Sequence, residues 1–466
     1  MSLASVIAVN RFGLGAAPGE LPAVATDPRA WLARQVAQPA PLAPELARLP
    51  TSSERLQEYP RWIASLGRAR SEMPGMGQSG RTIEGTFREH MGPILMEEVG
   101  ARLASAATTQ TPFHERLALF WANHFTVSAE KALVFALVGS FEREAIRPHV
   151  TGRFSDLLLA ASRHPAMLMY LDNHLSVRRG WQARRVARSA AFPPPTGLNE
   201  NLAREILELH TLGVDGGYTQ ADVTELARVI AGWTVRPMMN VPDAGAPGFV
   251  FEPDRHEPGP RTLLGRTYAE EGQAQGEAVL RDLAAHPATA RHLAVKLARH
   301  FIADEPPAGA VARIERAFRD ADGHLLTVYG ALLECPEAWE RPLAKFKTPI
   351  EYVVSVLRAL PAARGATPGA LYGALRGLGQ RPFFAPSPQG WADTGEAWAG
   401  ADGLWKRIEW AGLLAARLGS TVDPLRLARE SYGDALGERT RLAIERAESR
   451  PQGLALWLAS PEFQRR

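Results

Sequence analysis

Apolar residues recur every three or four positions along most of this chain, which is the spacing of one face of an α-helix. The pattern predicts helices over 27–38, 82–107, 112–125, 132–146, 199–212, 219–232, 272–284, 287–302, 308–321, 325–334, 348–360, 403–417 and 452–458. Capping residues stand where several of them begin, as in Thr111-Pro112 and Thr348-Pro349. Strand signals are confined to 233–252 and 261–268. We therefore expect a mainly α protein, a multi-helix body with at most a small β-hairpin.

The 466 residues can bury a large core, yet no linker divides them. We expect a single intertwined helical unit over 1–466, with an internal division near 185–198 as the alternative. Two long loops interrupt the helical pattern. Residues 176–198 contain five arginines and no acid, and 379–402 are rich in Pro, Gly and Trp. Loops of this length are usually functional or mobile.

Several classes of protein are excluded or disfavoured. Cys335 is the only cysteine, so an intramolecular disulfide and a cysteine-based zinc site are excluded. The net charge of +3 and the lack of a recognition motif disfavour nucleic-acid binding. No apolar run approaches the length of a membrane span, and the first residues lack the basic region of a signal peptide. We expect a cytoplasmic protein, or one exported with a partner.

The segment 199–213, NENLAREILELHTLG, concentrates polar residues on one face of a predicted helix. Asn201, Arg204, Glu205 and Glu208 share an arc, and the two carboxylates can converge on one cation. The alternative is a solvated face, on which Arg204 forms i,i+4 ion pairs with the glutamates on either side of it. His210 falls outside the arc, so we expect it in the core with a hydrogen-bonded ring.

Other candidate residues have equally plain alternatives. His124 lies on an apolar helix face, where a buried, hydrogen-bonded histidine is the usual outcome. His256 lies between acids in a loop, which suits a metal ligand or a surface histidine. Asp172 follows an apolar helix, where the dipole repels a carboxylate, so it needs a partner or exposure. Trp391 and Trp398 are either sugar-stacking platforms or residues that pack their loop onto the body.

Several long motifs resemble one bacterial family, known as domain of unknown function 1800. They are NRFGLGA near the start, LALFWANHFTVS at 117–128, PAMLMYLDN at 165–173, NENLAREILELHTLGVDGGYTQADVTELARVIAGWTV from 199, FEPDRHEPGPRTLLG at 251–265, KTPIEYVVSVLRAL at 347–360, GQRPFFAPSPQGWADTGEAW at 379–398 and the closing SPEFQ. The resemblance implies a helical protein, often encoded beside an exported sulfatase-like protein. The family commonly has phenylalanine in place of His210 and aspartate in place of Glu257.

Together these observations predict a metal-dependent enzyme, with hydrolysis favoured over oxidation, that acts on a polar or anionic, envelope-related substrate. The predicted ligands of a divalent metal are His124, Asp172, Glu205, Glu208 and His256, and the predicted catalytic residues are Glu205, His256 and Arg204. The predicted substrate-binding residues are Asn123, Asn173, Asn201, Arg184, Arg185, Trp391 and Trp398. The alternatives are a non-catalytic assembly partner of the sulfatase-like protein and a binder of anionic glycans.

Overall fold

The computed structural model describes residues 2–37, 40–59, 80–131, 134–182, 197–236 and 247–466. The first part of the chain forms α1 (Leu3–Ile7), α2 (Glu20–Val24), α3 (Pro28–Val36), α4 (Pro44–Ala47), α6 (Gly80–Thr108), α7 (Pro112–His124) and α8 (Val138–Phe141). The middle forms α9 (Phe154–Arg163), α10 (Pro165–Tyr170), α11 (Asn201–Glu205), α12 (Gln220–Ile230), α13 (Gln273–Ala285), α14 (Pro287–Phe301), α15 (Ala308–Asp320), α16 (Leu325–Leu333) and α17 (Glu337–Glu340). The last part forms α18 (Pro349–Ala359), α19 (Pro368–Gly377), α20 (Ala401–Leu418), α21 (Pro424–Tyr432), α22 (Glu438–Glu445), α23 (Arg450–Ala459) and α24 (Pro461–Gln464).

The expected mainly α fold is confirmed, but the β-structure differs in detail. The described residues hold two small antiparallel sheets in place of one hairpin. Strand β1 (Trp233–Val235) pairs with β2 (Phe249–Phe251), and β3 (Arg261–Leu263) pairs with β4 (Arg266–Tyr268). The turn between β3 and β4 contains Gly265 at φ 77°, a conformation that glycine adopts without strain.

Among the described residues three segments are π-helical, namely η1 (Ala8–Phe12), η3 (Glu142–Ile146) and η6 (Ile206–His210). Two of them correct the sequence prediction, because 132–146 and 199–212 were expected to be regular α-helices. The structure also contains helices that the periodicity did not predict, such as α9, α19, α21 and α22. Each of these has at most ten residues, too few for the pattern to repeat often.

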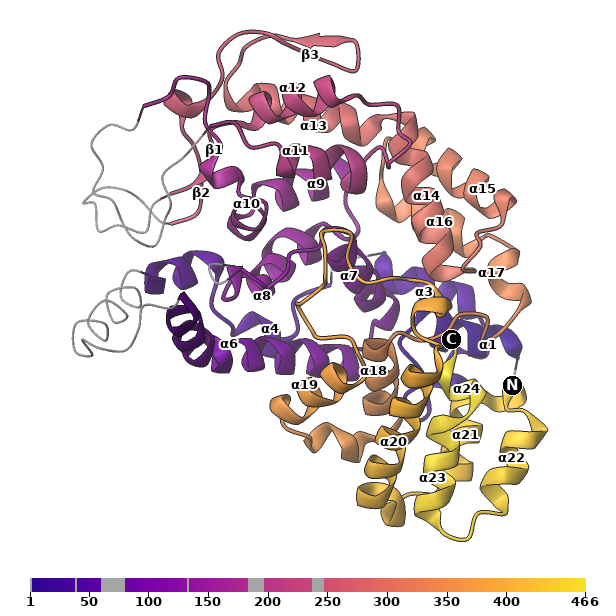
Figure 1. Cartoon of the computed structure of the whole chain (residues 1–466). Coiled ribbons are helices and arrows are strands. Elements are labelled where there is room, and N and C mark those ends of the chain that lie inside the picture. Colours follow the sequence, from indigo (N-terminus) through magenta and orange to yellow (C-terminus); the bar gives the residue numbers. More distant parts are fainter. Residues whose placement is uncertain (1, 38–39, 60–79, 132–133, 183–196, 237–246) are drawn as a thin grey trace.

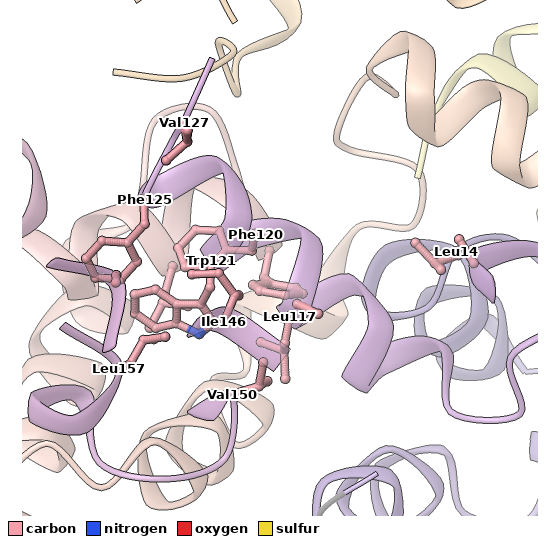
Figure 2. Close-up of a cluster of buried hydrophobic side chains, with 14 of the residues drawn as sticks. Leu14, Leu117, Phe120, Trp121, Phe125, Val127, Ile146, Val150 and Leu157 are labelled. Carbon is pink, nitrogen blue, oxygen red and sulfur yellow. The ribbon is translucent and has the colours of Figure 1, made fainter. Parts of the chain in front are cut away.

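Helix α7 lies in the middle of the molecule, between the group α9 to α13 and the group α18 to α24, while α14 to α16 lie on one side (Figure 1). One continuous cluster of buried apolar side chains extends from Val6 to Phe463. Around α7 the cluster includes Trp121 with Leu117, Phe120 and Phe125 (Figure 2). The indole of Trp121 donates to the hydroxyl of Tyr329 over 2.6 Å, so its one polar atom is satisfied.

No helix within the described residues is both long and apolar enough to cross a membrane. The predicted division near 185–198 falls largely on residues 183–196, outside the described part of the chain.

Candidate functional site

A pocket of about 110 Å³ lies beside α7, where α18, α14 and the loop after α19 meet it. This volume has room for a few water molecules or one small polar group. Aromatic residues in its wall include Phe120, Phe383 and Trp391. Its polar lining consists of Arg102, Arg116, Asn123, Thr126, Glu142, His300, Thr348, Glu351, Gln380 and Asp393.

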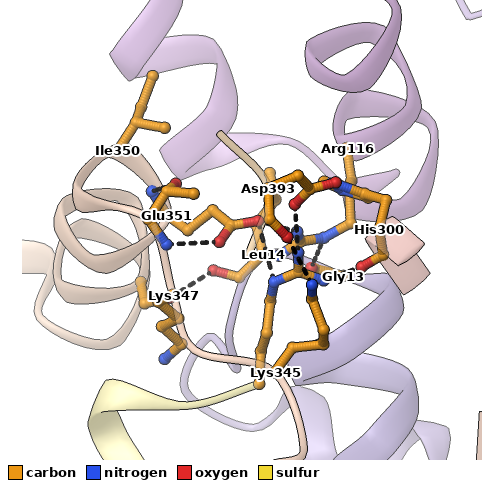
Figure 3. A network of polar contacts seen from close by, with 12 residues as sticks. Gly13, Leu14, Arg116, His300, Lys345, Lys347, Ile350, Glu351 and Asp393 are labelled. Atoms are coloured by element: carbon orange, nitrogen blue, oxygen red, sulfur yellow. Dashed lines mark hydrogen bonds and ion pairs between the residues drawn. The ribbon is translucent and has the colours of Figure 1, made fainter. Parts of the chain in front are cut away.

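Glu351 is a buried carboxylate of the pocket, and Figure 3 shows it with Arg116. Its local position is set by sequence, because Glu351 closes the capping box of α18 and accepts from the N–H of Thr348 over 2.8 Å. Arg116 on α7 donates to Glu351, and Arg466 Nε lies 3.0 Å from Glu351 Oε1. Burial alone would raise the pKa of Glu351, but Arg466 and Arg116 outweigh it and hold the pKa well below its ordinary value.

His300 and Asp393 form the second polar pair of the pocket. His300 Nδ1 lies 2.7 Å from Asp393 Oδ2, and Asp393 also lies 3.6 Å from Arg466 Nη2. The main-chain oxygen of Asp393 accepts from Lys345 over 2.6 Å. Burial lowers the pKa of His300, and Asp393 offsets this only in part, so the imidazole is neutral near pH 7.

The other ring nitrogen of His300 is unused. His300 Nε2 is buried and has no hydrogen-bond partner among the described residues. Because Asp393 is an acceptor, Nδ1 carries the ring proton and Nε2 carries the lone pair. An unpaired buried nitrogen in the wall of a pocket calls for a functional explanation.

A third charged group in the lining is also fully paired. Arg102 Nε lies 2.8 Å from Glu142 Oε2, and Arg147 lies 2.7 Å from the other oxygen of Glu142. Burial would raise the pKa of Glu142, but Arg102 and Arg147 outweigh it and lower the pKa. The charged lining residues thus neutralise one another within the protein.

Two amide side chains complete the lining. Gln380 accepts from the N–H of Ile350 over 2.8 Å with its oxygen, which leaves its NH2 group as a donor at the pocket. Asn123 instead binds the main chain of Trp391 with both of its polar atoms, over 2.9 and 2.8 Å. Gly390 is required beside this contact, because it has φ 85° and a Cβ there would lie 2.5 Å from the main-chain oxygen of Asn123.

Comparison with protein families identifies the chain. A family model described as "Protein of unknown function (DUF1800)" matches residues 7–465. The chain belongs to the DUF1800 family. Comparisons with curated proteins and with solved structures found no match.

Four of the eight stretches that suggested the DUF1800 family line the pocket. NRFGLGA contributes Leu14, and the segment 117–128 contributes Asn123 and its neighbours. The segment 347–360 contributes Glu351, and 379–398 contributes Gln380 and Asp393. Four motifs far apart in the sequence therefore meet in this DUF1800 chain at one place.

The predicted metal ligands do not meet there or elsewhere. His124 is buried, and its Nε2 lies 3.1 Å from the main-chain oxygen of His210. His256 is also buried, but its Nδ1 lies 3.0 Å from the oxygen of Ala231. In the described ranges no three His, Cys, Asp or Glu side chains are placed to hold a metal ion. The predicted metal centre is therefore not assembled, because each histidine bonds to a different main-chain segment.

Asp172 and Asn173 have structural partners. Asp172 forms an ion pair with Lys131 over 2.6 Å, so the partner that its position requires is a lysine. The amide of Asn173 donates to the oxygens of Ile230 and Trp233 over 3.2 and 2.9 Å. Asn173 thus ties α12 to β1 and is buried away from solvent, which leaves no free donor for a substrate.

The predicted polar face of 199–212 is partly solvated. Asn201 is exposed, while Arg204, Glu205 and Glu208 are half-buried. Arg204 lies 3.4 Å from Glu200, the expected i,i+4 pair, and Glu208 accepts from Tyr218 over 3.2 Å. Burial first, and then Glu208, raises the pKa of Glu205. The alternative of a solvated face therefore describes this segment better than a closed catalytic wall.

Two buried histidines, His124 and His210, lie close to the half-buried His292 and Lys296. The rings of His210 and His292 lie 6.1 and 6.3 Å from that of His124, and Lys296 lies one helical turn after His292 on α14. His210 is in the core as expected, but neither of its ring nitrogens has a hydrogen-bond partner in the part of the chain described, contrary to the prediction. Burial lowers the pKa of His210 to about 3 and that of His292 to about 4. Burial also lowers the pKa of Lys296 to about 8.

The remaining predicted residues divide into two groups. Arg184 and Arg185 lie outside the described residues. Trp391 lines the pocket, and the rings of Trp391 and Trp398 lie 5.9 Å apart.

Sequence reasoning missed the charged residues of the pocket, chiefly Arg116, His300, Glu351 and Asp393. One signal was available for His300. His292, Lys296 and His300 follow one another at i, i+4 and i+8, which places three bases on one face of α14. No signal in the sequence paired His300 with Asp393, since 92 residues separate them.

Proposed function

We propose that this DUF1800 protein is a hydrolytic enzyme whose general base is His300, oriented by Asp393. The observation that carries the proposal is the pairing of His300 Nδ1 with Asp393 at 2.7 Å in a residue that lines the pocket, while its buried Nε2 has no partner among the described residues. An imidazole held in one tautomer by a carboxylate is the usual arrangement of a histidine base. Hydrolysis was also the reaction favoured from the sequence, but at the helix 199–212.

The chemistry follows from the free lone pair. Nε2 of His300 takes a proton from a water molecule as the water oxygen attacks the electrophilic atom of the substrate. Asp393 stabilises the imidazolium that forms, and this imidazolium returns the proton to the leaving group as the scissile bond breaks. The NH2 group of Gln380 is a donor in the lining that suits the negative charge developing on the substrate, whereas Arg116 is held by Glu351.

A metal-dependent reaction, as predicted from the sequence, requires at least three converging ligands. The side chains named for it do not fit a metal in this structure, so the proposed reaction has no step through one. Elemental analysis of the purified protein tests this point. Stoichiometric metal that is lost in Glu205→Ala would return the active site to the helix 199–212.

Replacing His300 with glutamine is expected to lower turnover by at least about 100-fold, because general-base catalysis contributes 10²–10⁴-fold. Glutamine is neutral and can still donate to Asp393, so the fold should be kept. The measurement is a screen of the purified protein against chromogenic esters, phosphates, sulfates and glycosides, followed by kinetics of the best substrate. His324→Gln, a partly exposed histidine away from the pocket, is the control.

Two results would contradict the proposal. One is a His300→Gln variant that retains the wild-type rate. The other is a protein that hydrolyses none of these substrates, which favours the non-catalytic role beside a sulfatase-like protein that the sequence suggested.

A further inference from the structure

The loop between α19 and α20, residues 379–400, is called the tryptophan loop here. It has almost no helix of its own, apart from the single turn η9 (Gly395–Ala397). It is nevertheless firmly anchored. Asn123 binds both main-chain polar groups of Trp391, and Asp304 accepts from the N–H of Gly395 over 2.7 Å. Lys345 donates to the oxygen of Asp393. The main chain of the loop is therefore held in one conformation.

The anchored loop presents the indole of Trp391 at the pocket and that of Trp398 beside it. The rings of Trp391 and Trp398 lie 5.9 Å apart at 48°, and Trp398 Nε1 donates to the oxygen of Ala392 over 2.9 Å. Both side chains are only half-buried. Trp121, Trp233 and Trp457, by contrast, are completely buried. The half-buried pair thus keeps part of its indole surface open to contact with a ligand.

The pocket beside these rings suits a neutral polar ligand. Its arginines and carboxylates pair with one another, so no net charge is offered to an anion. The NH2 of Gln380 is the group left to bind a ligand. A pyranose ring combines an apolar C–H face with a rim of hydroxyl groups. It therefore matches an indole face next to a small polar pocket.

We propose that Trp391 and Trp398 form a stacking platform for a neutral sugar ring, so that the substrate class of the enzyme is carbohydrate. The reaction of the bound sugar depends on the proposed function, whereas the binding of the sugar to the two tryptophans does not. Residues 391 to 393 place the sugar face next to the catalytic pair, because Trp391 and Asp393 lie two positions apart in one fixed segment. The scissile group of the bound sugar would then reach Nε2 of His300.

Calorimetric titration with cellotetraose, chitotetraose, mannotetraose and tetragalacturonate tests the platform. We expect at least one of the neutral oligosaccharides to bind, and Trp391→Ala to weaken that binding about tenfold or more, equivalent to at least 1.4 kcal/mol. Trp391→Phe keeps an aromatic face, so its affinity should lie between that of the wild type and that of Trp391→Ala. Trp405→Ala is the matched control, since Trp405 is 61% exposed on α20 and does not line the pocket.

The outcomes separate the two proposals. His300→Gln should bind the oligosaccharide as the wild type does while losing turnover. If binding holds and turnover does not depend on His300, the platform stands and the proposed base is wrong. The platform is overturned if no neutral oligosaccharide binds, if only tetragalacturonate binds, or if Trp391→Ala and Trp391→Phe bind like the wild type.

Discussion

Glu351→Gln is expected to destabilise the protein by about 3–5 kcal/mol, the usual effect of removing one partner from a buried ion pair. Glutamine has the shape of glutamate and can still accept from the N–H of Thr348, so the start of α18 is kept. The loss comes from Arg116 and Arg466, whose side chains are 2% and 0% exposed. Without the carboxylate, two buried guanidinium groups keep their charge and have lost their counter-ion.

Urea-induced unfolding of the variant and of the wild type measures this difference. Glu438→Gln is the control, because Glu438 is 68% exposed in its pair with Arg441, and surface pairs contribute less than about 1 kcal/mol. The pKa of Glu351 is held well below its ordinary value, so the effect should be the same at pH 5 and pH 8. A loss no larger than that of Glu438→Gln would mean that Glu351 is not the central counter-ion of the pocket.

Acidification from pH 7 to pH 5 is expected to destabilise the protein through the buried histidines. The pKa of His210 is lowered to about 3 and that of His292 to about 4, first by burial and then by Lys296. The same causes hold the pKa of His124 well below its ordinary value. In the unfolded chain each histidine titrates near 6.5, so between about pH 6.5 and pH 4 the unfolded state binds more protons. The stabilisation is therefore complete above pH 6.5 and is lost as the pH falls.

His210→Phe isolates one of these contributions. At pH 5 a single buried histidine costs about 2 kcal/mol, since each unit between pH and the unfolded pKa is worth 1.36 kcal/mol. Between pH 7 and pH 5 the free energy of unfolding of the variant should fall by about 2 kcal/mol less than that of the wild type. Urea unfolding at both pH values measures this difference. His210→Leu avoids overfilling the site, and His324→Gln serves as a partly exposed control. An equal loss in wild type and both His210 variants would contradict the buried, neutral His210.

The helices were largely predictable because their signals are local. The capping box of Thr219 and Asp222 begins α12 as expected, and that of Thr348 begins α18. The π-helix at 206–210 was not predictable, because the same apolar spacing suits a regular α-helix. Within it, Thr211 Oγ1 donates to the oxygen of Ile206, a contact that closes the wider turn.

The candidate site, unlike the helices, could not be predicted from local sequence signals. The face of 199–212 attracted attention because its acids are neighbours in sequence, yet they remain half-solvated. The pocket brings together Arg116, His300, Glu351 and Asp393 from four separate segments. Each of them has an unremarkable local role: Glu351 is a cap, and His300 is one residue of an amphipathic helix.

The sequence by itself determined the helical class, most helix boundaries and the DUF1800 membership, since periodicity, caps and motifs are properties of neighbouring residues. Only the tertiary structure decided which charges lose their water. Glu351 becomes the counter-ion of Arg116 and Arg466, and His300 acquires Asp393, because folding brings segments 93 to 235 positions apart into one buried volume. Burial makes an unpaired charge energetically unfavourable and leaves an imidazole nitrogen without water as a partner. Burial depends on contacts between distant segments, which a local sequence pattern does not specify.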